Sequence, residues 1–587
     1  MEFIKRTFKW LLKTVVAITF ALLAVIILLS VMISRISDEN GPEKFIRQGS
    51  YMLLRFPDGL NESPSHEFNL LKFRLYDLSK RPLIFSDVLD KIFQASSDDR
   101  IKGIMLDLDN WNISVEHTGE IIKALKDLKL EDKKILAFGS TLNTANYYAA
   151  SVADEIIIDP SNSVPIILNG PGVTVPYFKN AAEKLGIGVN VVHIGRFKGA
   201  GENFSRDNMS DEYRISILKI LDQRLDVFCT EVAESRSLDK NEFEGQIKEG
   251  SLVFITPAEA LKYGLADKLR SFDGILKDLD IDKKNIISIH NYSYKSDIAN
   301  KKDKIAVILA EGNISGSGSD NDLSFIGITP SRIKKIVSEI KEHDDIKAVV
   351  LRVNSPGGSS LASEKILRML KELGSKIPLV VSMGPVAASG GYYISCAGEK
   401  ILAEPNTVTG SIGVVSIIPN FSGLYDKIGI NSERISTGKY SDIFDLTKEN
   451  NEEDILLLQK AMKRIYEEFK ERVSESRDIS PQSTEELAQG QIWTGEQAVA
   501  NGLADELGGL TKAIELSAEL AGIEDYGAVY FPKNYTLSQK IFSSGISLGA
   551  SDTFFRTGDV FKDELMYLKK NLILDKRPLL LLPVSFD

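Results

Sequence analysis

The feature that most constrains the fold is an internal repeat. Residues Asp99-Arg-Ile-Lys-Gly-Ile-Met-Leu106 are matched by Asp344-Asp-Ile-Lys-Ala-Val-Val-Leu351. Further matches follow in the same order, with a spacing that drifts by only a few residues, as short loop deletions would cause. They pair Gly139 with Gly384, Tyr147-Tyr148 with Tyr392-Tyr393, Lys184–Ile187 with Lys427–Ile430, and Gly264–Asp267 with Gly502–Asp505. Such conserved order indicates a duplicated domain.

Each copy alternates short apolar runs with amphipathic segments. In the second copy, residues 305–309 and 348–353 are apolar and β-rich, whereas residues 331–342 and 362–373 carry apolar side chains spaced by three and four. The first pattern predicts buried strands and the second predicts helices. Strands that alternate with helices form mostly parallel sheets covered by helices. We therefore predict an α/β protein, a tandem repeat of two α/β domains.

The domain boundaries follow from the repeat and from local composition. We place the first α/β repeat at residues 37–300 and the second at residues 301–525, since the stretch around residue 300 is charged and poor in apolar residues. Residues 526–587 depart from the repeat and are assigned to a carboxy-terminal tail. Within the tail, Pro578 and Pro583 enclose four leucines, which are too few to span a membrane. We expect an edge strand or a partner contact there.

The amino terminus has the pattern of a membrane anchor. Residues 14–33 contain no charged side chain and reach the ~20 residues that a spanning helix needs. Four basic residues precede this run, while Asp38 and Glu39 follow it closely. The positive-inside rule then predicts that residues 1–36 are a cytoplasmic stub and a single transmembrane helix, with the bulk of the chain outside the cytoplasmic (inner) membrane. A cleaved secretory signal is the alternative, but its apolar core is usually ~7–15 residues.

Charge and composition argue against several other functions. The net charge of −11 disfavours nucleic acid as a partner. The five histidines lack metal-ligand spacing, so we predict neither a metal nor a cofactor. Cys229 and Cys396 are too few for a disulfide framework or a thiolate cluster. We expect two buried free thiols, although the sequence leaves open whether they pair.

The segment 383–393, Met-Gly-Pro-Val-Ala-Ala-Ser-Gly-Gly-Tyr-Tyr, points to catalysis. It follows an apolar run at 377–381 that reads as a buried strand, and it leads into a helix-compatible segment at 392–397. Small residues at this junction allow a sharp turn, which would leave Ser389 at the helix N-terminus, where free N–H groups face a developing oxyanion. Ser389 is therefore a candidate nucleophile. The alternative is that Ser389 only caps the helix.

The two copies differ at the positions that would carry the catalytic residues. Thr144 takes the position of Ser389 in the first copy, without the two glycines that follow the serine. Conversely, Lys198 of the first copy corresponds to Ser441 of the second. Complementary loss is what a duplicated Ser/Lys enzyme would show if one composite site survived. We therefore predict that Lys198 is the general base for Ser389.

A second glycine motif occurs only in the copy that holds Ser389. Asn354-Ser-Pro-Gly-Gly358 ends a predicted strand, whereas the first copy has Asp109-Asn-Trp-Asn112 there. Two glycines allow backbone N–H groups to converge on a substrate carbonyl oxygen, as an oxyanion hole requires. An ordinary Pro-Gly turn is the alternative.

Together these motifs resemble the signal peptide peptidase A family in its long, duplicated form. The resemblance reaches from the anchor to about residue 520, and it rests on Asn354–Gly358, Ala387–Tyr393, Thr409-Gly-Ser-Ile-Gly413 and Trp493-Thr-Gly-Glu-Gln-Ala498. It implies that Ser389 is the nucleophile, that Lys198 is the base, that Ser411 hydrogen-bonds the lysine amine, and that Gly358 and Gly390 form the oxyanion hole. It also implies a fold of the Clp protease and crotonase type, and a homotetramer.

The expected activity is that of a serine endopeptidase with a Ser/Lys dyad. A lysine can serve as base at neutral pH only if burial lowers its pKa from about 10.4. A site tethered just outside a membrane suits apolar peptides, and the resemblance implies remnant signal peptides as substrates. Two other classes stay open: a crotonase-like acyl-CoA enzyme, which would not need Ser389, and a catalytically silent oligomeric scaffold at the membrane. Whether Lys198 meets Ser389 in one chain or between chains is also open.

Overall fold

The computed structural model describes residues 46–64, 83–293, 301–316, 327–533 and 579–581. The predicted anchor at 14–33 lies outside these ranges. Within them, no helix is both long and apolar enough to cross a bilayer. Both repeats lie in one compact unit, to which all described residues except Ile46 and Lys533 belong.

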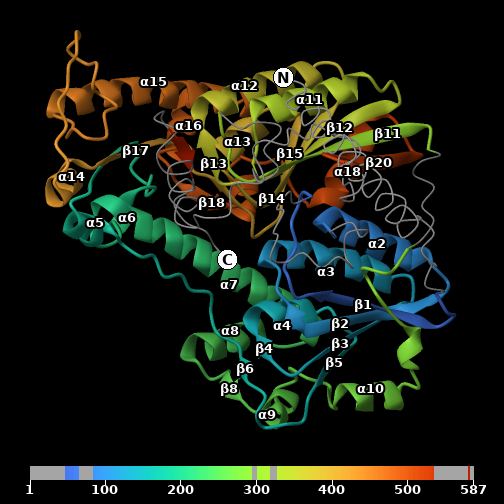
Figure 1. Ribbon diagram of the computed structural model, residues 1–587. Helices are drawn as coiled ribbons and strands as arrows, with labels where there is room; N and C mark the ends of the chain where they lie inside the picture. The colour runs from blue at the N-terminus through green and yellow to red at the C-terminus, as the bar shows by residue number, and fades with distance from the viewer. Residues whose placement is uncertain (1–45, 65–82, 294–300, 317–326, 534–578, 582–587) are drawn as a thin grey trace, which may run out of the picture. The chain divides into compact units, whose positions relative to one another are not determined.

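The first repeat forms a six-stranded parallel sheet in the order β10-β1-β2-β3-β5-β9. Helix α10 covers one face, where Ile275 and Leu276 pack against Met105 and Leu136, while α2 and α3 lie over the other (Figure 1). The strands of this sheet are β1 (Ser50–Phe56), β2 (Ile101–Trp111), β3 (Lys134–Gly139), β5 (Glu155–Ile158), β9 (Lys268–Leu269) and β10 (Ile286–Ser288). The helices of this repeat are α2 (Phe85–Ser97), α3 (Val115–Lys129), α4 (Thr144–Ala150), α5 (Lys179–Leu185), α6 (Glu202–Ser205), α7 (Asp211–Arg236), α8 (Lys240–Glu249), α9 (Pro257–Lys262) and α10 (Phe272–Asp278), with a short 3-10 turn at Lys283–Asn285. A small separate sheet joins β4 (Leu142–Asn143), β6 (Ile166–Ile167) and β8 (Val253–Ile255).

The second repeat forms a larger sheet in the order β18-β16-β14-β12-β11-β20, with β15 beside β14 and β19 beside β15. Its pairs are parallel except for β16 with β18. The strands are β11 (Asp303–Glu311), β12 (Ile346–Ser355), β14 (Leu379–Ala388), β15 (Lys400–Ala403), β16 (Val408–Gly410), β18 (Ile492–Thr494), β19 (Glu506–Leu507) and β20 (Tyr526–Phe531). The helices are α11 (Pro330–Lys341), α12 (Ser360–Gly374), α13 (Gly390–Ser395), α14 (Ser422–Ile428), α15 (Glu452–Arg477), α16 (Pro481–Leu487), α17 (Gly495–Ala500) and α18 (Leu510–Ala521). The prediction of an α/β protein with two mostly parallel sheets is confirmed.

Local sequence accounts for these elements well. The run Ala348–Val353 is fully buried in β12, because helices cover both faces of a parallel sheet. Helix α12 begins where the Ser359 hydroxyl accepts a hydrogen bond from the N–H of Ala362. Its buried side chains, Ile366, Leu367, Leu370 and Leu373, keep the predicted spacing of three and four. Cys229 and Cys396 are both buried free thiols, as expected.

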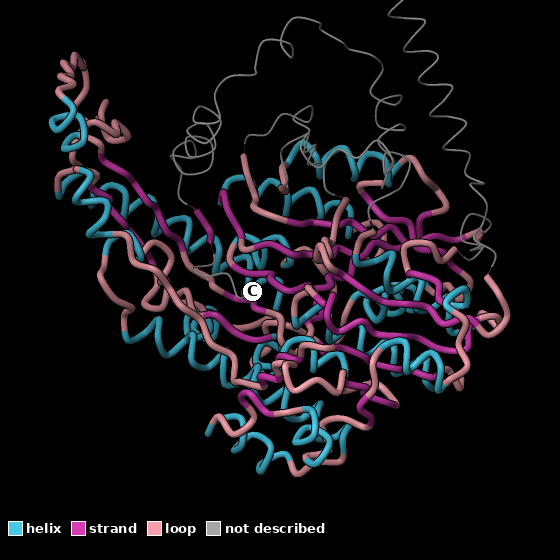
Figure 2. The backbone as a smooth tube through the Cα atoms, turned by 60° about the horizontal axis from the view of Figure 1, so that its bottom comes forward, coloured by secondary structure: helices cyan, strands magenta, loops and turns pink. Residues whose placement is uncertain are grey.

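A further sheet joins the two repeats. It has the order β13-β21-β17-β7, with β7 (Gly188–Ile194) from the first repeat and β13 (Gly357–Ser359) and β17 (Val414–Asn420) from the second. Strands β7 and β17 pair in antiparallel orientation, with Gly188 opposite Asn420 at one end and Ile194 opposite Val414 at the other. Figure 2 draws the strands in magenta. Because β7 pairs with β17, the residues that follow β7 lie beside the second repeat.

The carboxy-terminal region contributes one strand to the main sheet of the second repeat and one to the sheet that joins the repeats. Strand β20 pairs in parallel with β11, so the main sheet extends past residue 525, where we place the start of the tail. Strand β21 (Leu579–Leu581) lies between β13 and β17. The expectation of an edge strand there is therefore wrong, because both sides of β21 are paired.

A buried ionic network also connects the repeats. The Arg352 guanidinium, in β12, donates to carboxylate oxygens of Glu62 and Glu120 from the first repeat. The other oxygen of Glu120 accepts the N–H of Leu510, the first residue of α18, at 2.6 Å. Burial alone raises the pKa of Glu62, but Arg352 and His117 outweigh it and lower that pKa to about 2. The carboxyl group of Glu62 therefore stays ionised although it is buried between the repeats.

Candidate active site

Ser389 lies at the junction of β14 and α13, where the small-residue motif predicts a sharp turn. Its backbone has φ 54° and ψ −113°, a conformation that L-residues rarely adopt and that is typical of functional sites. Its N–H donates to the carbonyl oxygen of Gly410 at 2.8 Å. The hydroxyl makes no capping hydrogen bond to α13, so the interpretation of Ser389 as a mere helix cap is wrong.

Lys198 meets Ser389 within one chain. The lysine follows β7 in a loop of the first repeat and is only 1% exposed. Its Nζ lies within hydrogen-bond distance of three oxygens: Ser389 Oγ at 2.8 Å, Ser411 Oγ at 2.9 Å and the carbonyl oxygen of Ser411 at 2.8 Å. The structure thus brings together the three side chains that the sequence singled out, one from the first repeat and two from the second.

Burial sets the protonation state of this lysine. Desolvation holds the pKa of Lys198 well below the ordinary lysine value. The carboxylate nearest in sequence, Glu202, accepts instead from the N–H and the hydroxyl of Ser210, at 3.1 and 2.5 Å. The three oxygens around the amine belong to uncharged groups. The site therefore favours a neutral amine, which is the form that can accept a proton.

The lysine loop is held by a segment that our sequence reasoning did not identify. The N–H of Phe197 donates to the carbonyl oxygen of Gln489 at 2.7 Å, and the N–H of Arg196 donates to the Gln489 side chain at 3.0 Å. A Cβ on Gly490 would lie 2.6 Å from Cβ of Lys198, so only glycine fits at this approach. The signal was present in the sequence as a glycine just ahead of the Trp493 motif.

The two glycines predicted for the oxyanion hole are neighbours beside Ser389. Gly358 has φ +150°, and a Cβ there would lie 2.0 Å from the carbonyl oxygen of Ile314. A Cβ on Gly390 would lie 3.1 Å from the backbone nitrogen of Gly358. Gly357–Ser359 forms strand β13, so the interpretation as an ordinary Pro-Gly turn is wrong. Neither glycine position has room for a side chain.

The counterparts of the dyad in the other copy have different surroundings. Thr144 lies at the start of α4, and its hydroxyl donates to the carbonyl oxygen of Asn169 at 2.6 Å. Ser441 is exposed, and its hydroxyl donates to the carbonyl oxygen of Gly438 at 3.0 Å. The described residues thus hold one composite Ser/Lys pair rather than two.

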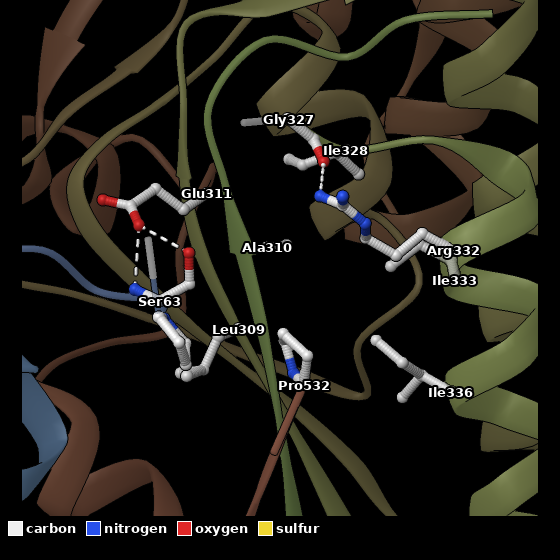
Figure 3. A pocket seen from close by; sticks show the side chains of 11 residues that line it. Ser63, Leu309, Ala310, Glu311, Gly327, Ile328, Arg332, Ile333, Ile336 and Pro532 are labelled. Atoms are coloured by element: carbon white, nitrogen blue, oxygen red, sulfur yellow. Dashed lines mark hydrogen bonds between the residues drawn. The ribbon is translucent and has the colours of Figure 1, made fainter. Parts of the chain in front are cut away.

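A small pocket lies elsewhere, between β11 and α11 (Figure 3). Glu311 on one side accepts from the N–H and the hydroxyl of Ser63, at 2.8 and 2.7 Å. Arg332 on the other side donates to the carbonyl oxygen of Gly327 at 2.7 Å. Because both charged groups already have partners within the chain, we assign no ligand to this pocket.

The fold and the composite site are those of a serine protease, and comparison with known proteins gives the family. The model of Peptidase family S49 matches residues 127–286 and 371–524, one segment in each repeat. The chain belongs to peptidase family S49, in a duplicated form. It is similar to Protease 4 of Haemophilus influenzae, with 33% identity over 76% of this chain and 75% of the relative. It is also similar to Protease 4 of Salmonella typhi (32% identity; 82% and 80% covered) and to the chloroplastic serine protease SPPA of Arabidopsis thaliana (29%; 82% and 71%).

Proposed function

We propose that this serine protease is a membrane-anchored endopeptidase in which Ser389 is the nucleophile and Lys198 the general base. The observation that carries the proposal is the 2.8 Å contact between a fully buried amine and the hydroxyl of a strained serine. Buried lysines whose pKa is depressed are suited to activate a neighbouring hydroxyl. The alternative acyl-CoA enzyme and the silent scaffold give no reason for this contact.

Attack on a peptide begins with the neutral amine. As Ser389 Oγ bonds to the scissile carbonyl carbon, its proton passes to Nζ of Lys198. Ser411 offers its carbonyl and hydroxyl oxygens to the resulting ammonium, which keeps the amine aimed at the serine. The negative charge on the tetrahedral oxygen is stabilised by the backbone N–H groups of Gly358 and Gly390.

Collapse of the tetrahedral intermediate breaks the C–N bond. The lysine ammonium gives its proton to the leaving amine, so the base returns to its neutral form. Water then attacks the acyl-serine ester and loses a proton to Lys198. The ester C–O bond breaks, the ammonium returns that proton to Ser389 Oγ, and the carboxylic product leaves. No metal or cofactor is required at any step, because the dyad and two backbone donors supply all proton transfers and charge stabilisation.

Single replacements test the dyad. We expect Ser389→Ala and Lys198→Met each to reduce hydrolysis of casein or of a peptide ester by about 10³-fold or more. The two residues act as a unit, so the loss of either one removes most of the catalysis that the pair provides. Thr144→Ala is the matched control, because Thr144 holds the position of Ser389 in the first repeat, and it should keep full activity. Full hydrolysis by either dyad variant would rule out the mechanism.

The proposed substrates are apolar peptides outside the cytoplasmic membrane, including remnant signal peptides. The uncharged run at 14–33 and its basic flank support the location, and the family motifs support the substrate class. Membrane fractionation with and without residues 1–36, followed by protease accessibility from the outer side, tests the anchor. A synthetic signal peptide should be cleaved faster than a polar peptide of equal length; equal rates would contradict this substrate class.

We propose further that the protein assembles as a homotetramer. Exposed apolar side chains support assembly, namely Leu185 on α5, Ile428 on α14 and Ile435 after it, which are 57%, 59% and 93% exposed. Light scattering of the purified protein should give the mass of four chains. Ile428→Asp with Ile435→Asp should yield smaller species, and a monomeric wild type would contradict the proposal.

A further inference from the structure

The turn at residues 489–491 joins α16 to β18 and lies against the loop that carries Lys198. The N–H of Phe197 donates to the carbonyl oxygen of Gln489 at 2.7 Å. A Cβ on Gly195, where the loop begins, would lie 2.7 Å from the carbonyl carbon of Gln489. The backbones of the loop and the turn are therefore in direct contact.

The same turn also lies against the loop that carries Ser411. The N–H of Ser411 donates to the carbonyl oxygen of Gln491 at 2.7 Å. The N–H of Gly490 donates to the carbonyl oxygen of Ile412 at 2.8 Å. The turn thereby fixes the loop of Lys198, which belongs to the first repeat, relative to a loop of the second repeat.

The side chain of Gln489 makes a hydrogen bond at each end of its amide. Its Oε1 accepts from the N–H of Arg196 at 3.0 Å, and its Nε2 donates to Oε1 of Glu485 in α16. Lys470 of α15 donates to the other oxygen of Glu485 at 2.5 Å, so this carboxylate has a cation of its own. An N–H on one side needs an acceptor and a carboxylate on the other needs a donor, and an amide supplies both.

The backbone of Gln489 is in the left-handed region, with φ 58°. Residues with a Cβ adopt this conformation at a cost, and they keep it where the surrounding structure holds them there. The hydrogen bonds to Arg196, Phe197 and Glu485 provide that support. Gln489 is therefore held from α16 on one side and holds the lysine loop on the other.

We propose that Gln489 is a positioning residue for the general base, and that its amide keeps Nζ of Lys198 within reach of Ser389. The inference rests on the proposed function of the Ser389 site. The amine reaches the serine from the other repeat, so any shift of the lysine loop changes the 2.8 Å distance between Nζ and Ser389 Oγ. A misplacement of about 1 Å can cost about 10²-fold in rate.

Gln489→Gly tests this role. Glycine accepts the left-handed backbone and keeps the carbonyl oxygen that binds Phe197, but it removes both side-chain hydrogen bonds. We expect kcat on a peptide ester to fall by about 10- to 100-fold with KM unchanged. Asp478→Gly is the matched control, because Asp478 also has a left-handed backbone, with φ 51°, and is exposed at the end of α15; it should keep the wild-type kcat. A wild-type kcat in Gln489→Gly would overturn the proposal.

The pH–rate profile separates positioning from a mere loss of folded protein. Because only the neutral amine accepts a proton, kcat/KM should rise with pH as Lys198 deprotonates. In Gln489→Gly, water that reaches the displaced amine stabilises its charged form, so the midpoint of this rise should shift toward the ordinary lysine pKa of about 10.4. A smaller folded fraction would instead lower kcat/KM by one factor at every pH. A reduced kcat with an unchanged midpoint would overturn the positioning role.

A rescue experiment tests the side chain itself. Gln489→Glu sets a second carboxylate against Glu485, and we expect it to lower kcat on the alkaline plateau. Adding Glu485→Gln restores a donor beside an acceptor, and it should recover at least about threefold of the lost kcat, since one net hydrogen bond is worth about 0.5–1.5 kcal/mol. A double variant no faster than Gln489→Glu would contradict a role of the amide.

These outcomes are distinct from a failure of the dyad. If Ser389→Ala or Lys198→Met keeps full hydrolysis, the catalytic mechanism is wrong and Gln489 has no base to position. If both dyad variants are inactive while Gln489→Gly matches the wild type, the mechanism stands and only the positioning role is overturned.

Discussion

Arg352 donates two hydrogen bonds to Oε1 of Glu62, at 2.9 Å from Nε and 2.6 Å from Nη2, although the residues are 290 positions apart in the chain. Arg352 lies in β12, which continues into the strand that carries Gly358, and its Nη1 donates to Ser382 of β14, the strand that ends at Ser389. The contact therefore joins the first repeat to both strands that lead into the site. A composite site needs such a connection, since Lys198 and Ser389 belong to different repeats.

Loss of this arginine should destabilise the protein strongly. Arg352→Met would remove the guanidinium that the buried carboxylates of Glu62 and Glu120 share, and breaking such a buried pair typically costs about 3–5 kcal/mol of unfolding free energy. Arg270→Met is the matched control, because Arg270 is 56% exposed and pairs with Asp278, which is 50% exposed; it should cost at most about 1 kcal/mol. Urea unfolding measures both, and equal costs would show that the network contributes little.

The stability of the protein should carry the signature of a neutral lysine. Burial lowers the folded-state pKa of Lys198, whereas the unfolded chain has a lysine pKa near 10.4. Between these values the unfolded state binds a proton that the native state lacks, so the unfolding free energy contributed by Lys198 rises with pH across this window. The wild type should therefore gain stability relative to Lys198→Met as pH rises, until the difference levels off near pH 10.4. A pH-independent difference would contradict a neutral Lys198.

The rate of hydrolysis should follow the same titration. kcat/KM should rise with pH as Lys198 loses its proton and then reach a plateau, because only the free amine can act as base. The pH–rate profile of the wild type on a neutral peptide ester measures this limb. A rate that falls as pH increases through this range would argue against lysine as the base.

The space at Gly358 should be essential for activity. Gly358→Ala would bring a Cβ to 2.0 Å from the carbonyl oxygen of Ile314, so β13 must shift and carry the proposed oxyanion donor with it. Loss of one such donor costs about 10²–10³ in kcat. Gly522→Ala is the control, since Gly522 also has positive φ but no atom within 4 Å of the added Cβ; it should retain activity. Comparable activity in the two variants would contradict the role of Gly358.

Ser411 should contribute less than the dyad. Ser411→Ala removes one of three hydrogen bonds of the amine but keeps the backbone carbonyl of residue 411 as a partner. One net hydrogen bond is worth about 0.5–1.5 kcal/mol, which corresponds to a decrease of about 2- to 12-fold in kcat. Ser517→Ala removes the hydroxyl of an equally buried serine in α18 and should leave kcat unchanged. Inactivity of Ser411→Ala would mean that the serine does more than orient the lysine.

Local patterns predicted the regular elements because those patterns act over a few residues. The predicted helix at 331–342 is α11, and the predicted strand at 348–353 is the centre of β12. The strand predicted at 377–381 is longer, because β14 runs on through Pro385 to Ala388. Glycine and proline there weaken the strand signal in sequence, while pairing with β12 and β16 maintains the strand.

The sequence by itself determined the duplication, the alternation of strands and helices, and the pairing of one copy's serine with the other copy's lysine, because repeats and complementary losses are visible along the chain. Only the tertiary structure decided that Lys198 is buried within reach of Ser389 in one chain, that Gln489 and Gly490 hold its loop, and that the leucines near the carboxy terminus lie between β13 and β17. Burial and long-range strand pairing depend on segments hundreds of residues apart, and no local pattern specifies which of them will meet.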